Sequence, residues 1–224
     1  MAEKVSNHDF IELNYTGKLS DGKVFDTTIL EVAQKNHFHA KNRAFEPVIV
    51  CVGEKQLLPG LDANLEGKEV GKEFSITLQP EEAFGKKDVK KVQLVPLATF
   101  KEHKLNPHPG LQVDFDGKVG TVMRVSGGRV MVNFNHPLSG REVTYDCIIT
   151  RKVTDPLEKV KVFVANSFGF NKQFVEVEGD EKKVVAKVPF EMPKEVMDLL
   201  SKKVVEKTGV KEVVFESSAV KKEQ

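Results

Sequence analysis

The fold is decided near the N-terminus by residues 10–26, which read FIELNYTGKLSDGKVFD. Between residues 11 and 15 apolar and polar side chains alternate, a period of two that is typical of a strand with one buried face. Residues 20–23, Ser-Asp-Gly-Lys, supply the small and polar residues that favour a tight turn, and residues 24–26 begin a second strand. The segment therefore predicts an antiparallel β-hairpin.

The chain downstream predicts more strands around one helix. Residues 48–52 form a β-branched run between Pro47 and a glycine, and residues 74–78 alternate again, so both ranges are expected to be strands. Between them, leucines recur at helical spacing over residues 58–65, which predicts a helix of about two to three turns. Residues 31–46 are polar and without a clear period, and we interpret them as a long surface excursion.

The hydrophobic pattern and the charge of the sequence change at residues 87–135. A short apolar piece at 94–100 precedes three alternating strands at 111–115, 119–125 and 130–134. Eight Lys and Arg against four Asp and Glu give this range a net charge of +4. It is expected to be a small β unit of its own, and the alternating residues 143–149 predict one more strand after it.

After Thr154-Asp155-Pro156, which we interpret as a boundary, the last part of the chain predicts a mixed α+β module. The alternating valines at 160–164 predict a strand, and residues 174–188 a hairpin around Gly179-Asp180. A helix is expected from Pro193 to Gly209, followed by a strand over 210–215.

Composition excludes several classes of protein. Of 224 residues, 40% are hydrophobic and 30% charged, which excludes a wholly disordered chain, and a net charge of +1 disfavours nucleic-acid binding. Cys51 and Cys147 lie in strand-like runs, so we expect reduced, packed thiols and a cytoplasmic protein. The sequence has neither an apolar run of membrane-spanning length nor a signal-peptide pattern, and we expect no membrane partner.

Motifs for covalent or cofactor chemistry are absent from the sequence. It contains no nucleophile elbow, no phosphate-binding glycine loop and no dinucleotide-binding turn, so no cofactor is expected. His37 and His39 form a His-x-His pair without a third ligand nearby, which predicts surface polar residues and no metal site. Cys147 with His136 as a base is a weaker interpretation than a buried structural thiol.

Several short motifs together resemble a known family. They are Tyr15-Thr16-Gly17, Asp21-Gly22-Lys23-Val24-Phe25-Asp26, Val52-Gly53, Leu57-Leu58-Pro59-Gly60-Leu61, Gly67 with Glu69-Val70-Gly71, and Ala83-Phe84-Gly85. In this order and spacing the sequence resembles the FKBP-type peptidyl-prolyl cis-trans isomerases. The segment 135–140, which follows the β-rich insert, is similar to that of the SlyD-like branch, whose members carry an insert-in-flap chaperone domain. The likeness covers residues 5 to about 153 and extends only loosely to long archaeal forms with a C-terminal extension.

The resemblance implies an α+β multidomain fold. Residues 1–86 and 136–153 would form an FKBP-like antiparallel sheet wrapped on a short helix, 87–135 a small all-β insert-in-flap domain, and 154–224 an α+β C-terminal domain. It also implies a pocket with catalytic and substrate-binding residues. The catalytic positions would be Tyr15, Asp26, Phe84 and Tyr145, and the substrate-binding positions Phe25, Val48, Leu57, Leu58 and Leu61.

Two of these positions depart from the family pattern. Leu61 stands where the family often has Trp, which gives a shallower pocket floor, and Phe84 stands where Tyr is usual, which removes a hydroxyl. Asp26 is the residue least expected in an apolar cleft, because a carboxylate there needs a partner. It either holds the loop by bonding Tyr15 and backbone N–H groups, or faces the substrate carbonyl, or does both.

The expected function is peptidyl-prolyl isomerisation combined with chaperone action on unfolded or partly folded proteins. Desolvation in an apolar pocket would lower the barrier to rotation, and the insert would recruit clients. The alternative is a holdase that binds unfolded chains with little isomerase activity, and a nucleic-acid module ranks last. The expected partners are proline-containing polypeptides, with macrolide inhibitors and a homodimer through the C-terminal domain as further options.

Overall fold

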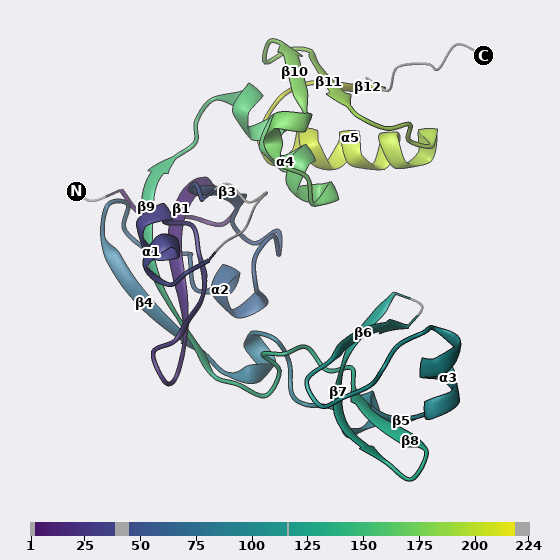
Figure 1. Cartoon of the computed structure of the whole chain (residues 1–224). Coiled ribbons are helices and arrows are strands. Elements are labelled where there is room, and N and C mark those ends of the chain that lie inside the picture. Colours follow the sequence, from purple (N-terminus) through teal and green to yellow (C-terminus); the bar gives the residue numbers. More distant parts are fainter. Residues whose placement is uncertain (1–2, 39–44, 116, 218–224) are drawn as a thin grey trace. The chain divides into compact units, whose positions relative to one another are not determined.

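The chain folds into two compact units in the computed structural model, which describes residues 3–38, 45–115 and 117–217 (Figure 1). Unit 1 combines residues 1–78 with 143–224, and unit 2 comprises residues 79–142. Strands and helices occur in both, which confirms the expected α+β class. The three predicted domain ranges stay predictions.

A five-stranded antiparallel sheet forms the first part of unit 1. Its strands are β1 (Phe10–Leu19), β2 (Val24–Thr27), β3 (Val48–Cys51), β4 (Glu73–Leu78) and β9 (Val143–Lys152). The order is β2-β1-β9-β4, and β3 also pairs with β1. The predicted hairpin is confirmed as β1 and β2, and Figure 1 shows β1 and β9 as long neighbouring strands.

The two helices of this part differ from the sequence expectation. Helix α1 (Leu30–Lys35) occupies the start of the predicted surface excursion, while residues 39–44 of that excursion lie outside the described residues. Helix α2 (Pro59–Ala63) is shorter than predicted. The helix ends because the Asn64 side-chain amide folds back and donates to the Gly60 carbonyl oxygen at 2.7 Å. Leu65, which follows the end of the helix, is nevertheless fully buried.

The second part of unit 1 is an α+β module. It contains α4 (Pro156–Phe168), the 3-10 turn η3 (Lys172–Phe174), β10 (Glu176–Gly179), β11 (Val184–Val188), α5 (Lys194–Thr208) and β12 (Val213–Ser217). The strands form a sheet of order β10-β11-β12, in which the hairpin β10–β11 is antiparallel as predicted. Helix α5 ends at Gly209 with φ 82°, a left-handed conformation that glycine adopts without strain.

The predicted strand at residues 160–164 is wrong, because this range belongs to helix α4. The Asp155 carboxylate accepts the backbone N–H groups of Leu157 and Glu158, and Pro156 occupies the first helical position. Both are helix-start signals, and in the sequence the same residues also fit a domain boundary. Helix α4 buries most of its circumference, so its valines at alternate positions imitate a strand pattern.

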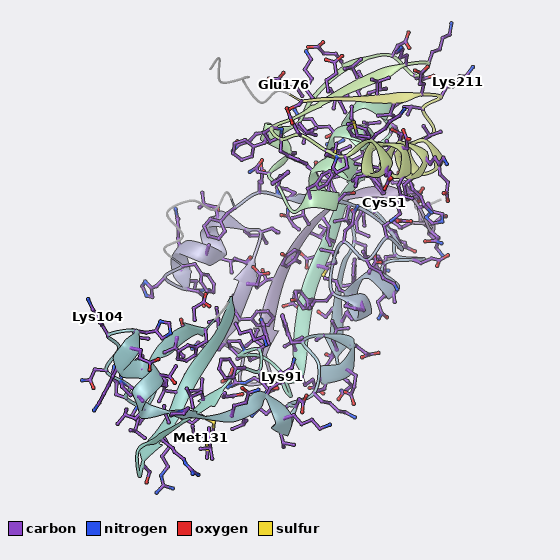
Figure 2. All side chains as sticks on the ribbon, turned by 90° about the vertical axis from the view of Figure 1, so that its right-hand side faces the viewer. Cys51, Lys91, Lys104, Met131, Glu176 and Lys211 are labelled. Atoms are coloured by element: carbon purple, nitrogen blue, oxygen red, sulfur yellow. The ribbon has the colours of Figure 1, made fainter. Side chains whose placement is uncertain are left out.

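One hydrophobic core joins the module to the sheet. Phe10, Ile49 and Cys51 of the sheet belong to the same buried cluster as Val160 and Phe163 of α4. The rings of Phe10 and Phe163 have centroids 6.1 Å apart, and Figure 2 labels Cys51 at the end of β3. The module is therefore packed against the sheet within unit 1.

Unit 2 contains a four-stranded sheet with a helix. Its elements are η1 (Pro80–Glu82), η2 (Val89–Lys91), β5 (Val92–Pro96), α3 (Leu97–Glu102), β6 (Gln112–Phe115), β7 (Lys118–Ser126) and β8 (Arg129–Asn133), with strand order β5-β8-β7-β6. The three predicted strands are confirmed. The apolar piece at 94–100 divides between β5 and α3, and Phe100 of α3 is fully buried in the core.

Candidate functional site

Three aromatic rings from different strands meet on unit 1. Tyr15 of β1 and Tyr145 of β9 have ring centroids 5.6 Å apart, and Phe25 of β2 lies 5.8 Å from Tyr145 with its ring perpendicular. We call these three residues the aromatic cluster. Tyr145 is 3% exposed, whereas Tyr15 and Phe25 are half-buried, so the cluster has a closed base and an accessible side.

Gly17 permits this close approach. It pairs with Asp26 of β2 on one side and with Tyr145 of β9 on the other. A Cβ atom at Gly17 would lie 2.7 Å from the Phe25 ring and 3.0 Å from the Tyr145 ring, too close for either to stay in place. In the sequence, Gly17 is recognisable only as part of a family motif. Its role in the close approach of the rings is visible only in the sheet register.

Asp26 places a carboxylate beside the rings. The Tyr15 hydroxyl donates a hydrogen bond to Asp26 Oδ2 at 3.1 Å. Burial raises the pKa of Tyr145, and the negative charge of Asp26 raises that pKa further. Tyr145 therefore stays protonated at physiological pH, and the structure brings together four of the predicted site residues: Tyr15, Phe25, Asp26 and Tyr145.

A cavity adjoins the aromatic cluster. It has a volume of about 510 Å³, and three predicted residues, Tyr15, Val48 and Leu57, line it. Asn166 and Phe170 of the C-terminal module contribute to the same cavity. The volume lies within the range of about 300–1,000 Å³ that is usual for ligand pockets.

The loop between β3 and α2 carries the predicted substrate-binding residues Leu57 and Leu58. The buried Asp62 carboxylate accepts the N–H groups of Gly53 at 3.0 Å and Lys55 at 2.9 Å, which fixes the loop. Leu58 ends it as the residue before α2, and Leu61 in α2 is 2% exposed. Asp62 is not among the residues predicted from the sequence, and the available signal was an acid in the first turn of a predicted helix.

Phe84, the remaining predicted site residue, lies in unit 2. Its ring stacks on His136 with centroids 4.6 Å apart and planes 2° apart. Its contribution to the pocket stays a prediction.

The other candidate chemistries find little support. Cys51 and Cys147 are free and buried, and burial raises the pKa of each thiol to about 12, so neither is a thiolate at physiological pH. Within residues 3–38, 45–115 and 117–217 no cluster of three or more His, Cys, Asp or Glu could hold a metal ion. His39 of the His-x-His pair lies outside the described residues. Among the described helices, none is long and apolar enough to span a membrane.

Family models match the chain in two places. Residues 1–101 match the family described as FKBP-type peptidyl-prolyl cis-trans isomerase, and residues 93–138 match the domain described as FKBP26, IF domain. The short-type peptidyl-prolyl cis-trans isomerase of Methanocaldococcus jannaschii is 32% identical over 155 residues, which cover 69% of this chain and 96% of that protein. The chain belongs to the FKBP-type peptidyl-prolyl cis-trans isomerase family.

Bacterial relatives give the same assignment. The FKBP-type isomerase SlyD of Aeromonas hydrophila is 34% identical over 139 residues, or 61% of this chain and 59% of that protein. The FKBP-type 16 kDa isomerase of Escherichia coli is 28% identical over 151 residues, or 65% of this chain and 92% of that protein. The predicted family and enzyme class are confirmed, including an insert of the IF type.

Proposed function

We propose that this FKBP-type isomerase rotates X-Pro bonds of polypeptides at the aromatic cluster. One observation carries the proposal: the Phe25 and Tyr145 rings close over Gly17, the Tyr15 ring contacts Tyr145, and the Tyr15 hydroxyl donates a hydrogen bond to the Asp26 carboxylate. The proline ring of the substrate would pack against Phe25 and Tyr145. No nucleophile is needed, because the reaction makes and breaks no covalent bond.

Desolvation supplies most of the rate enhancement in this mechanism. The X-Pro barrier is about 18–20 kcal/mol because rotation breaks amide resonance. Water stabilises the charge-separated planar amide, so a dry pocket raises the planar state relative to the twisted one. The Leu58 N–H would hold the carbonyl of the residue before proline and so position the bond. Because this donor favours the planar amide, its contribution of about 0.5–1.5 kcal/mol must be outweighed by desolvation.

Asp26 has two roles in the proposal. By accepting a hydrogen bond from the Tyr15 hydroxyl it fixes the orientation of that ring, and its negative charge would face the substrate carbonyl region. The twisted amide has a more basic nitrogen and a less negative oxygen than the planar amide. A carboxylate near that oxygen therefore repels the planar state more than the twisted state.

Two departures from the family pattern would limit the fit of the site. Phe84 has no hydroxyl to donate to a substrate carbonyl, and Leu61 gives a smaller floor than Trp. Both changes leave apolar surface in place, so the desolvating character of the pocket is retained.

A proline-limited refolding assay tests this function. The wild-type protein should accelerate the slow phase of a client that waits for X-Pro isomerisation, and Asp26→Ala should reduce that acceleration about tenfold, as expected for loss of a charge-assisted hydrogen bond. If the wild type gives no acceleration at any client concentration, the isomerase proposal is wrong and the holdase alternative replaces it.

We also propose a chaperone function for unit 2, supported by its exposed apolar surface. Leu94 of β5 pairs with Met131 of β8, and Met131 pairs with Arg124 of β7. Together with Ser126 and Arg129 they line a hollow of about 200 Å³, which we call the insert hollow. Leu94 is 58% exposed, and an open apolar surface with a basic rim suits weak binding of unfolded chains.

Deleting residues 88–134 tests the chaperone function. Activity on a short proline peptide should persist, whereas activity on an unfolded protein should fall, because a second binding site raises the effective concentration of the client. Equal losses on both substrates would show that the insert supports the pocket and does not recruit clients.

Three finer predictions concern inhibitors, oligomeric state, and cellular location with partners. Macrolide inhibitors would occupy the same apolar pocket, a homodimer would form through the C-terminal module, and the protein would act in the cytoplasm without nucleic-acid partners. Competition by a macrolide in the peptide assay and mass measurement in solution test the first two.

A further inference from the structure

The cavity beside the aromatic cluster has two walls. Tyr15, Val48 and Leu57 form the wall on the sheet side. Asn166 at the end of α4 and residues 169–172 after it form the other wall. The site and the C-terminal module therefore share one cavity inside unit 1.

Hydrogen bonds fasten the two walls together. The Asn166 side-chain amide donates to the Ile49 carbonyl oxygen at 2.9 Å and to Gln56 Oε1 at 3.0 Å. Gln56 Oε1 also accepts the Cys51 N–H at 2.9 Å. The last turn of α4 is thus bonded to both β3 and the loop that leads to Leu57.

Ion pairs between the loop after β3 and helix α5 also hold the module in place. Glu54 Oε1 lies 2.9 Å from Lys207 Nζ, and Glu54 Oε2 lies 3.3 Å from Lys203 Nζ. Burial alone would raise the pKa of Glu54, but the hydrogen bonds from Lys207 and Lys203 outweigh it and lower that pKa. The second wall is therefore fixed in place and does not need to close on a ligand.

The second wall presents both an apolar ring and polar groups. Phe170 is 38% exposed and rests on Phe168 and Phe190, with ring centroids at 6.0 and 5.3 Å. Lys172 Nζ lies 3.9 Å from Glu46 Oε2, a loose pair between half-exposed side chains. A polypeptide segment fits such a wall, because it offers apolar side chains to Phe170 and backbone N–H groups to the side-chain oxygen of Asn166, whose two amide hydrogens are already used.

We propose that the end of α4 and the turn after it form a subsite for the substrate residues that flank the proline. The C-terminal module is then part of the substrate cleft and favours apolar or aromatic flanking residues, which pack on Phe170. The argument rests on the proposed function, because continuity with Tyr15, Val48 and Leu57 identifies the occupant as the same polypeptide.

Because the sequence contains no tryptophan, a single introduced tryptophan can report binding directly. Phe170→Trp keeps an aromatic ring in the subsite and provides a single fluorophore. Titration with a 12-residue peptide that has aromatic residues flanking its proline should shift the emission, and a blocked tetrapeptide with the same X-Pro pair should not. Phe174→Trp is the matched control, since Phe174 is 56% exposed in the same module and does not line the cavity.

Kinetics provide the second test in the full-length protein. For Phe170→Ala, kcat/KM on the 12-residue peptide should fall about three- to tenfold more than on the tetrapeptide, mainly through KM. Phe174→Ala should change neither. Equal losses on the two peptides, or an emission shift at residue 174 as large as at 170, would overturn the subsite. A wild-type protein inactive on the tetrapeptide would instead refute the proposed isomerase function.

Discussion

The aromatic cluster of unit 1 and the insert hollow of unit 2 are built in opposite ways. In the cluster, Tyr145 is 3% exposed and Gly17 leaves no room for another carbon atom. In the hollow, Leu94 is 58% exposed beside two arginines on an open sheet face. The first surface can exclude water from one bond, whereas the second can bind many sequences without fixing any of them.

The difference separates catalysis from capture in physical terms. Lowering a rotational barrier requires differential stabilisation of one twisted geometry, which needs fixed rings and a dry environment. Holding an unfolded chain requires only that apolar surface be removed from water. Mutations should therefore affect the two regions unequally.

The largest effect is expected from Gly17→Ala. The added methyl group meets the Phe25 and Tyr145 rings at 2.7 and 3.0 Å, so the rings must move apart. Overpacking of this kind costs about 1–3 kcal/mol of stability. We expect kcat/KM on a proline tetrapeptide to fall about tenfold or more, measured together with unfolding in denaturant.

The matched control for this change is Gly22→Ala in the same hairpin. Gly22 has φ 81° and nothing within 4 Å of an added Cβ, so alanine costs about 1–2 kcal/mol of backbone strain without touching the cluster. The control should lose stability and keep its kcat/KM. If both variants lose activity in proportion to stability, the close approach at Gly17 has no catalytic meaning.

A smaller effect is expected on the stability of unit 1 when the pH is lowered. The pKa of Glu54 is lowered in the folded protein, so its ion pairs contribute stability above its ordinary value of 4.5, and this contribution is lost as pH falls through the lowered value. Glu54→Gln should cost about 1.5–3 kcal/mol at pH 7 and much less at low pH. Denaturant unfolding across this pH range measures the difference.

Glu178→Gln is the control for the charge effect. Glu178 Oε1 pairs with Lys187 Nζ at 2.9 Å, but its side chain is 66% exposed, so its loss should change stability by less than about 1 kcal/mol. A pH-independent cost for Glu54→Gln would mean that shape, and not charge, fastens the module.

Sequence reasoning predicted the elements whose local pattern agrees with their tertiary surroundings. The hairpin at residues 10–27 and helix α5 were found because alternation, turn residues and stop signals all agree there. Helix α4 was missed because it is buried on several sides, and its valines then show no single apolar face. Helix α3 was missed because its six residues are too few to show a period.

The candidate site was only partly predictable for a related reason. Tyr15, Phe25, Asp26 and Tyr145 were identified through family motifs, and their contacts follow from the strand register. Asn166 contributes through hydrogen bonds to Ile49 and Gln56, which lie 117 and 110 positions earlier in the sequence. No local sequence pattern encodes such bonds. Such long-range contacts require the tertiary structure.

The smallest effect is expected on the open surface. Leu94→Ser combined with Met131→Ser removes apolar groups from the insert hollow and leaves the core residues Val130 and Val132 in place. Capture of an unfolded client, measured as suppression of its aggregation, should weaken about threefold, because only a few partly buried methylene groups are lost. Val89→Ser, at a residue that is 83% exposed and outside the hollow, should have no effect. Since the hollow does not act on the bond itself, kcat/KM on the tetrapeptide should stay unchanged in both variants, and a parallel loss there would show that capture and catalysis share one surface.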